Sequence, residues 1–370
     1  MRLTTFALVV VAVPLGAQLP GDAPNGVART GLIYESYSFG SGLGLSRASE
    51  LTVPLTVSHR FGQRLSLDLA GAYASAMLRG SDGTETGVSG LTDTDIRATV
   101  AVVPGRVLLT LVGTLPTGIT TLPDSTLPLF GILASDLLGF TTPTFGSGGG
   151  ITGGVATASR VGSWALGAGA SYRYCGSYEP VADGGDLKPG NEARARLGAE
   201  GPIGAGRYLR VALMYTLSQH DEMTGGSPSV SGDRVLLYSH LSMPVGRSSL
   251  SVYGFDMYRM RARELNTTAT SVVDVPRGNV LELGARLDHP LSPRANLAPS
   301  VELRHELTEQ DTGLAPVGLL VRPGLDLRYR MGGSATLVID GQFAVGYLDD
   351  QGSHVSLTGP RVGAMLEWTR

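Results

Sequence analysis

The 370-residue chain has a single cysteine, almost no lysine and little charge of either sign. Cys175 has no cysteine partner in the chain, so an intramolecular disulfide is excluded. Charged residues are 16% of the total and leave a net charge of −3, which gives no reason to expect a nucleic-acid partner. No apolar run reaches the ~18 residues that a membrane-spanning helix needs, so a helical membrane protein is excluded.

Motifs of catalysis and of metal binding are missing as well. The histidines are scattered, without HExxH or comparable ligand spacing; they are His59, His220, His240, His289, His305 and His354. No GxSxG elbow or Walker loop occurs, and the glycine-rich run 148–154 lies in a strand-like segment rather than before a helix. We therefore expect no enzyme, no metal site and no cofactor. Cys175 has the inward parity of its segment, and we expect it to be a small buried residue.

Glycine, by contrast, is abundant, with 52 of 370 residues. Short turns rich in glycine, proline and arginine recur near 60–64, 104–106, 160–163, 201–206, 244–248, 289–294 and 330–333. The strand-like runs between these turns are joined at their other ends by longer polar loops. Alternation of short and long connections is typical of an up-and-down β-barrel in a bacterial outer membrane, with the short turns on the periplasmic side.

Apolar and polar residues alternate in most of the runs. In one of the clearest, Leu319 and Val321 oppose Arg322, and Leu325 opposes Asp326. Strands of soluble sandwiches average five or six residues, whereas these runs have about 12 to 15; at ~3.3 Å per residue and a tilt near 45° such a run covers roughly the ~30 Å of a bilayer core. The apolar face is therefore expected to face lipid, and the face rich in glycine, alanine, serine and charge is expected to face the lumen.

The predicted fold is all-β, an up-and-down antiparallel transmembrane β-barrel of about 16 strands, with both termini periplasmic. The expected strands are 29–39, 48–60, 64–78, 92–103, 106–116, 147–160, 163–177, 191–202, 206–218, 232–245, 248–262, 279–289, 294–307, 316–330, 333–347 and 355–368. The first two are the weakest, because 34–39 alternates poorly and Pro54 removes a ladder donor. Fourteen strands is the alternative.

The N-terminus has the pattern of a secretory signal peptide. A positive charge at Arg2 precedes an apolar run, and the small residues Gly16 and Ala17 follow it. We expect residues 1–17 to be the signal peptide, 18–28 a short periplasmic segment and 29–370 the barrel. This organisation predicts a location in the bacterial outer membrane.

Aromatic residues occur where the belts at the two membrane interfaces would place them. At the short-turn end we expect Phe61, Trp164 and Trp368, and at the long-loop end Tyr73, Tyr172, Tyr174, Tyr215 and Tyr347. Core aromatics scattered without a belt are the alternative.

The longest loop, 116–146, is too apolar for a solvated connection. Its apolar residues are Leu127, Leu129, Phe130, Ile132, Leu133, Leu137, Leu138 and Phe140. Ser125 or Thr126 would cap a short helix with Pro128 in its first turn and Gly139 at its end. Two interpretations stand side by side: the loop folds into the lumen as a constriction or as the lining of an entrance for apolar molecules, or it rests as a lid on the rim or on lipopolysaccharide.

Charged residues with inward parity are predicted to line the lumen. They are Arg259, Arg261, Glu282, Arg286, Glu302, Arg304, Glu306, Arg322, Asp326, Arg328 and Arg330 on the late strands, and Asp93, Asp95 and Arg97 on an early one. Arginines opposite acids would create a transverse field that selects solutes, or would only brace the wall as ion pairs. Bracing is favoured for the group Glu302, Arg304 and Glu306, and lumen lining for the arginines of 316–330. For Asp93 and Asp95, inward lining is favoured over a cation site.

Residues 88–178 resemble one known family. The segments 89–94 (SGLTDT), 111–118 (LVGTLPTG), 145–149 (FGSGG) and 164–174 (WALGAGASYRY) are similar to the meta-pathway phenol-degradation-type outer-membrane proteins, of the wider FadL-like transporter group. The resemblance covers about a quarter of the chain and rests mostly on glycine and proline. It implies a channel for small molecules, aromatic ones included. The long apolar insertion at 120–144 and a chain that ends on Arg370, two residues after Trp368, depart from the pattern.

Together these features predict an outer-membrane channel for passive uptake of small organic solutes, with access controlled by the 116–146 loop. The expected partners are outer-membrane lipid and lipopolysaccharide, the small-molecule solute, and the barrel-assembly machinery through the C-terminal strand. The alternative is a structural or adhesive barrel with a charge-braced, closed lumen and no transport. Catalysis on the outer wall, known for some lipolytic barrels, is a third and weaker alternative.

Overall fold

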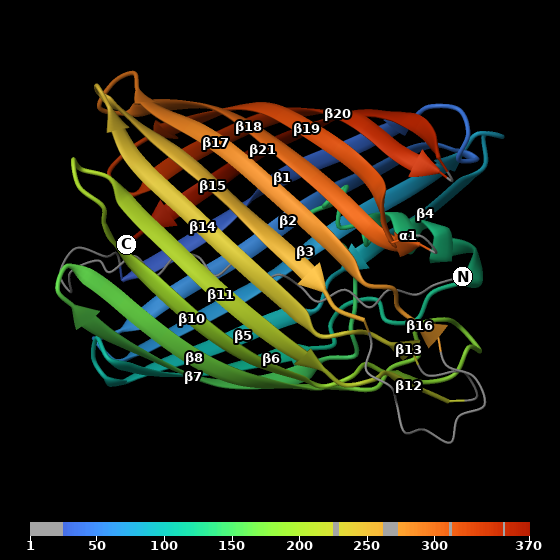
Figure 1. Ribbon diagram of the computed structural model, residues 1–370, viewed down its shortest axis with the longest axis horizontal. Coiled ribbons are helices and arrows are strands. Elements are labelled where there is room, and N and C mark those ends of the chain that lie inside the picture. The colour runs from blue at the N-terminus through green and yellow to red at the C-terminus, as the bar shows by residue number, and fades with distance from the viewer. Residues whose placement is uncertain (1–24, 225–228, 262–272, 311–312, 351) are drawn as a thin grey trace.

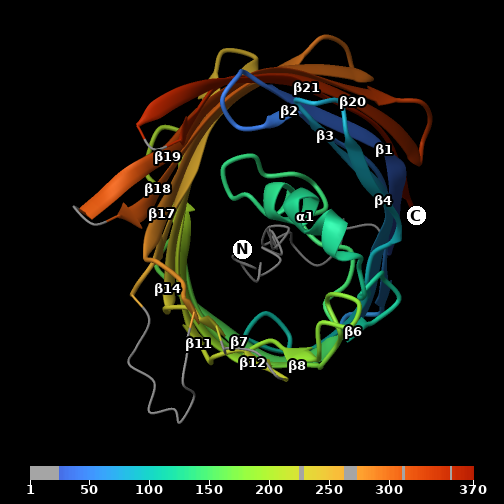
Figure 2. The same ribbon diagram turned by 90° about the vertical axis from the view of Figure 1, so that its right-hand side faces the viewer.

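The structure, a computed structural model, is a closed antiparallel β-barrel (Figures 1 and 2). It describes residues 25–224, 229–261, 273–310, 313–350 and 352–370, so the predicted signal peptide lies outside the described residues. β1 pairs with β2 on one side and with β21 on the other, which closes the wall. β4 and β5 both pair with β3 and together form one interrupted strand, so the barrel has 16 strands, as predicted.

The wall consists of β1 (Gly26–Phe39), β2 (Leu45–Phe61), β3 (Leu65–Gly80), β4 (Glu85–Leu91), β5 (Thr94–Val103), β6 (Val107–Leu115), β7 (Gly150–Val161), β8 (Trp164–Cys175), β10 (Glu192–Pro202), β11 (Tyr208–Ser218), β14 (Arg234–Val245), β15 (Ser248–Arg259), β17 (Gly278–Pro290), β18 (Ala295–Gln310), β19 (Gly313–Arg330), β20 (Ala335–Asp350) and β21 (Ser353–Thr369). Two pairs of short strands lie in the long loops: β9 (Leu187–Lys188) with β12 (Glu222–Met223), and β13 (Ser229–Val230) with β16 (Val273–Asp274). The helical segments are η1 (Asp124–Thr126) and α1 (Leu127–Leu133).

The outer face of the wall is apolar. Alternate residues such as Leu111, Leu197 and Leu283 expose 52%, 60% and 51% of their surface to the outside. Because a closed ladder satisfies the backbone groups internally, this wall can face lipid without leaving hydrogen-bonding groups unpaired. No helix in the described part of the chain has the length and hydropathy to cross a membrane.

The predicted short turns are all present between consecutive strands, but the connections at the other end are not uniformly long. β1 and β2 are joined by residues 40–44, β3 and β4 by 81–84, β18 and β19 by 311–312, and β20 and β21 by 351–352. The expectation of a longer loop in every hairpin is therefore wrong at these positions. The strands simply continue, and β19 reaches 18 residues.

Two smaller differences concern the first strands. β1 begins at Gly26, inside the segment predicted to precede the barrel. Pro54 does lie within β2, and the β1–β2 register has no pairing between Thr30–Leu55 and Ile33–Thr52, where its missing donor falls. β1 is nevertheless held, because β21 pairs along its other edge.

The connection between β6 and β7 enters the barrel. The segment 116–149, which we call the inserted loop, joins β6 to β7 and carries α1 inside the ring of strands (Figure 2). It lies against one side of the wall. This placement decides which inward side chains are covered and which stay accessible.

Candidate functional site: the lumen and its inserted loop

The inserted loop leaves and rejoins the wall beside the break between β4 and β5. Asp93, at that break, accepts hydrogen bonds from the Gly118 N–H at 3.1 Å and from the Ser147 N–H and hydroxyl, both at 2.7 Å. The two legs are so close that a Cβ on Gly118 would lie 2.0 Å from the Phe145 carbonyl oxygen. A single carboxylate therefore ties both legs of the loop to the barrel.

The helical part of the loop is shorter than predicted. Thr126 is the N-cap residue of α1 and Pro128 lies in its first turn, as expected, but the Thr126 hydroxyl donates to the Pro123 carbonyl at 2.6 Å and does not cap the helix. α1 ends at Leu133, and Gly139 closes the next turn with a φ of 59°. The helix is too short to persist by itself, so its packing must hold it.

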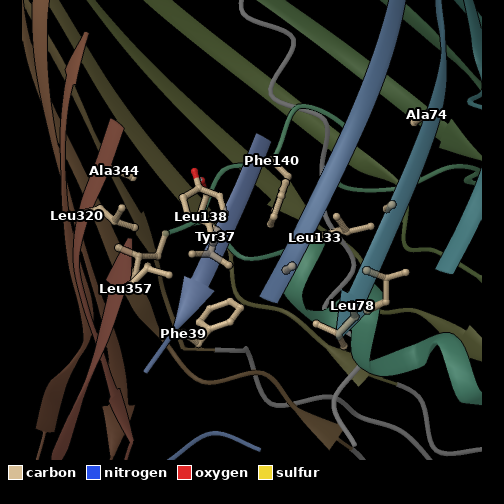
Figure 3. Close-up of a cluster of buried hydrophobic side chains, with 14 of the residues drawn as sticks. Tyr37, Phe39, Ala74, Leu78, Leu133, Leu138, Phe140, Leu320, Ala344 and Leu357 are labelled. Carbon is tan, nitrogen blue, oxygen red and sulfur yellow. The ribbon is translucent and has the colours of Figure 1, made fainter. Parts of the chain in front are cut away.

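The apolar side chains of the loop point at the wall and not into the passage (Figure 3). Leu129 and Leu137 are fully buried, Leu133 and Leu138 are 1% exposed, and Phe140 is 5% exposed. Leu127 is half-buried, and Phe130 and Ile132 pack at the margin of the cluster. The wall contributes inward side chains of β1, β2, β3, β19, β20 and β21, namely Tyr37, Phe39, Ala48, Ala74, Ala76, Leu78, Leu320, Ala344 and Leu357.

This packing distinguishes between the two interpretations of the loop. The loop lies inside the lumen and does not rest as a lid on the rim. The buried leucines are also unavailable to line an entrance for apolar molecules. Phe140 meets the edge of Tyr37 at 5.1 Å between ring centroids, and Phe130 meets Phe145 at 5.8 Å.

Buried carboxylates hold the returning leg of the loop. Glu35 and Glu50 face each other across β1 and β2 and are each 1% exposed. The Thr141 N–H donates to Glu35 at 2.8 Å and the Thr142 N–H donates to Glu50 at 2.9 Å. Arg361 of β21 donates to Glu35 at 2.9 Å and balances part of the charge. Both carboxylates thereby bind the backbone of the loop.

Arginines bind the tip of the loop from β18 and β19. Arg304 donates to the Asp136 carbonyl at 2.9 Å, and Arg322 donates to the carbonyls of Leu137 and Leu138. These carbonyls follow the C-terminus of α1, where cations are favoured. Burial raises the pKa of the Asp136 carboxyl, and the guanidinium groups of Arg259, Arg304 and Arg234 oppose the shift.

Many of the predicted lumen-lining charges on the late strands are paired with each other. Arg304 pairs with Glu282 and Arg286 with Asp326. Glu302 accepts a hydrogen bond from the Tyr253 hydroxyl at 2.8 Å. Glu306 lies near the Leu137 backbone of the loop and near the Arg259 guanidinium. These groups brace the wall or the loop, as favoured for Glu302, Arg304 and Glu306, and Arg322 joins them instead of lining a passage.

The remaining predicted positions divide between the lumen and the rim. Asp95 accepts from the Thr114 hydroxyl at 2.6 Å, and Arg97 has inward parity and no salt bridge in the described part of the chain. Arg328 and Arg330 are exposed near the short-turn end. Arg261 lies past the end of β15 and pairs with Glu309 with 71% of its side chain exposed, so its placement in the lumen is wrong.

A second set of inward arginines is absent from the predicted lumen-lining residues. They are Arg173 on β8, Arg194 and Arg196 on β10, Arg210 on β11 and Arg234 on β14. The signal was present in the run 192–196, EARAR, where arginine alternates with alanine. The outward position of Leu197 confirms that Arg196 faces the lumen.

The aromatic residues predicted to form the two belts lie on the outer face, and their position at the membrane interfaces stays a prediction. Phe61, Tyr73, Tyr172, Tyr174, Tyr215 and Trp368 are exposed, and Trp164 and Tyr347 are half-buried. Trp164 covers Gly201 of the neighbouring strand, and Tyr347 stacks on His354 at 4.3 Å. Cys175 is buried at 4% exposure. Among the described residues no group of three or more histidine, cysteine, aspartate or glutamate side chains is arranged to hold a metal ion.

Several solved outer-membrane proteins are similar to this chain. OmpT of Vibrio cholerae is 11% identical, with 94% of this chain and 99% of that chain covered and a TM-score of 0.43. An anion-selective porin from Comamonas acidovorans is 14% identical, with 93% and 98% covered and a TM-score of 0.44. OpdQ of Pseudomonas aeruginosa is 13% identical, with 92% and 98% covered and a TM-score of 0.47. No family model matches the chain, and no curated protein sequence is significantly similar to it.

The closed hydrogen-bonded wall and its apolar outer face show that the barrel is surrounded by lipid. The chain is a β-barrel of the bacterial outer membrane. Its short turns accordingly lie on the periplasmic side, and its long loops face outward.

Proposed function

We propose that this barrel is a passive channel for small organic solutes, in which the inserted loop narrows the lumen. The observation that carries the proposal is that the loop packs against one side of the inner wall and leaves the opposite side uncovered. The loop buries the inner wall of β1–β3 and β19–β21, where Ala48, Ala74 and Leu320 have no exposed surface. On β8, across the lumen, the inward residues Ala165, Gly169, Ser171 and Arg173 are half-buried and reached by solvent.

The loop acts as a fixed constriction. Fully burying a leucine side chain is worth about 1.5–3 kcal/mol, and Leu129, Leu133, Leu137 and Leu138 are all buried. Moving these four side chains from the wall into water would cost several times the thermal energy. Access is therefore controlled by the space that the loop leaves, and swinging of the loop is not required.

The lumen also offers a surface for apolar or aromatic parts of a solute. Register and parity place Leu236 and Tyr238 of β14 and Phe255 and Met257 of β15 on the inner face. Arg304 lies over the Phe255 ring at 6.0 Å, which agrees with that inward position. Together with the resemblance of residues 88–178 to FadL-like transporters, this surface supports hydrophobic or aromatic organic solutes as cargo. We assign no catalytic activity.

Removal of the loop tests the proposal. Residues 120–144 are replaced by a short glycine linker between Ile119 and Phe145, which the close approach of the two legs allows. The purified wild type is expected to form channels in planar bilayers, and the deletion variant to form channels of higher conductance. If both proteins fold and neither conducts, the structural or adhesive barrel with a closed, charge-braced lumen is favoured.

A further inference from the structure

The inner wall opposite the loop carries a row of arginines. Strand register aligns Arg194 with Thr216, Thr216 with Arg234, and Arg234 with Arg259, so three arginines of β10, β14 and β15 lie in one row across the strands. Arg173 lies two residues further toward the outside on β8 than Ser171, the partner of Arg194, and Arg196 lies two residues toward the periplasm. We call Arg173, Arg194, Arg196, Arg234 and Arg259 the arginine wall.

Acids balance this wall only in part, and Asp136 and Glu306 are the acids within electrostatic range of Arg259. Glu192 pairs with both Arg194 and Arg234, and Glu200 pairs with Arg210 nearer the periplasmic end. Arg173, Arg196 and Arg259 make no salt bridge with any residue that the structure describes. The Nε atoms of Arg194 and Arg234 are buried without a hydrogen-bond acceptor. A guanidinium group presents five N–H donors and suits carboxylate or phosphate oxygens, so this wall retains unused donor capacity.

The inserted loop brings no positive charge to the facing side. Its segment 116–149 contains no lysine, arginine or histidine, and its titratable residues are Asp124 and Asp136. The Asp136 carboxylate lies within electrostatic range of Arg234 and Arg259. Acidic loop tip and basic wall therefore face each other, and an anion between them is drawn toward the wall.

We propose that the lumen is anion-selective and that the arginine wall binds the carboxylate or phosphate group of the permeating solute. The proposal rests on the channel function above and names its solute class as small organic anions. Phe255 and Met257 project from the same strand as Arg259 and two residues apart along it, so an apolar or aromatic body and an anionic group can be held together. The net charge of −3 for the whole chain conceals this local excess of positive charge.

Reversal potentials in a potassium chloride gradient test the proposal. The test variant combines Arg173→Gln, Arg196→Gln and Arg259→Gln, which removes three charges and leaves Glu192 with both of its partners. Wild type is expected to prefer chloride over potassium. The variant should lose about two-fold in that preference for each charge removed, the combined effect on chloride and potassium of one charge ~8 Å away in water that contains about 0.1 M salt. The difference should shrink in 1 M salt, where the screening length is only about 3 Å.

A matched control removes the same charge from the periplasmic turns, through Arg64→Gln, Arg106→Gln and Arg247→Gln. The control should keep the wild-type preference. A wild-type channel that prefers potassium, or equal loss of preference in control and test variants, would overturn anion selection by the arginine wall and leave the channel function intact. Wild-type protein that folds but does not conduct would instead overturn the channel function.

Binding of inorganic phosphate provides a readout that does not need conduction. Line broadening of the phosphorus resonance is measured on detergent-solubilised, folded protein. Broadening is expected with wild type and with the turn control, and a loss of broadening is expected with the test variant. Equal broadening by all three proteins, or none by any, would contradict a binding site at the arginine wall.

Discussion

Arg304 serves both the wall and the loop. Its guanidinium group pairs with Glu282 on the neighbouring strand and donates to the Asp136 carbonyl at the tip of the loop. Gly139 makes this possible, because a Cβ there would lie 2.0 Å from Nη1 of Arg304. The positive φ of Gly139 adds a second reason for glycine, since left-handed backbone costs other residues about 1–2 kcal/mol.

We expect Gly139→Ala to loosen the tip of the loop without unfolding the barrel. Hydrogen exchange of the Thr141 and Thr142 amides, which donate to Glu35 and Glu50, should become faster. Gly131→Ala is the matched control, because Gly131 lies in α1 with nothing within 4 Å of a Cβ. Equal exchange rates in both variants would show that contact with Arg304 does not hold the tip.

At the scale of elements, the loop fits because the wall beneath it is built of small residues. Ala48 and Ala74 have no exposed surface, and Ala76 and Ala344 are each 3% exposed. Large side chains at these inward positions would occupy the space that α1 and the turn after it now fill. The recess and the apolar face of the loop are complementary, and each shields the other from water.

We expect Ala74→Leu to push the loop away from the wall without releasing it. Overpacking of a close-packed site costs about 1–3 kcal/mol, less than burial of the four leucines provides, and the wall cannot yield because β2 and β4 pair with β3 on both sides. Single-channel conductance should fall, because the loop moves into the lumen. Ala70→Leu, on the same strand and face but outside the cluster, should leave conductance unchanged. Higher or unaltered conductance in Ala74→Leu would count against this movement.

At the scale of the whole molecule, the barrel turns an alternating pattern into two environments. Leu111 is 52% exposed on the lipid side of β6, while its neighbour Thr110 faces the lumen. An arginine on the lipid face near the bilayer midplane costs about 2–4 kcal/mol, whereas a lumen position is tolerant. The two neighbouring residues differ in this respect only because their side chains point to opposite faces of the strand.

Leu111→Arg should therefore destabilise the folded barrel in lipid by about 2–4 kcal/mol, and Thr110→Arg by much less. Denaturant unfolding in vesicles, followed by tryptophan fluorescence, measures both. Similar losses in the two variants would contradict the assignment of the faces.

Much of this architecture can be predicted from individual residues of the sequence. The alternation of Leu325 with Asp326 marks the two faces, and Gly62, Gly105, Gly162 and Gly246 occupy positive φ in predicted turns. For the inner arginines, the sequence predicts the inward face but not their alignment across the strands. Arg194 and Arg196 alternate with alanine in the sequence, but their alignment with Arg234 and Arg259 depends on the stagger between strands, which no local pattern encodes.

The sequence by itself determined the barrel, its strand number and its inner face, because period-two alternation and turn chemistry act between neighbouring residues. Only the tertiary structure decided where the inserted loop lies and which charges stay unpaired. Those outcomes depend on contacts such as Arg322 with Leu138, separated by 184 residues, and Arg361 with Glu35, separated by 326. Closure of the barrel brings such pairs together, and it leaves the part of the lumen that the inserted loop does not fill open to a solute.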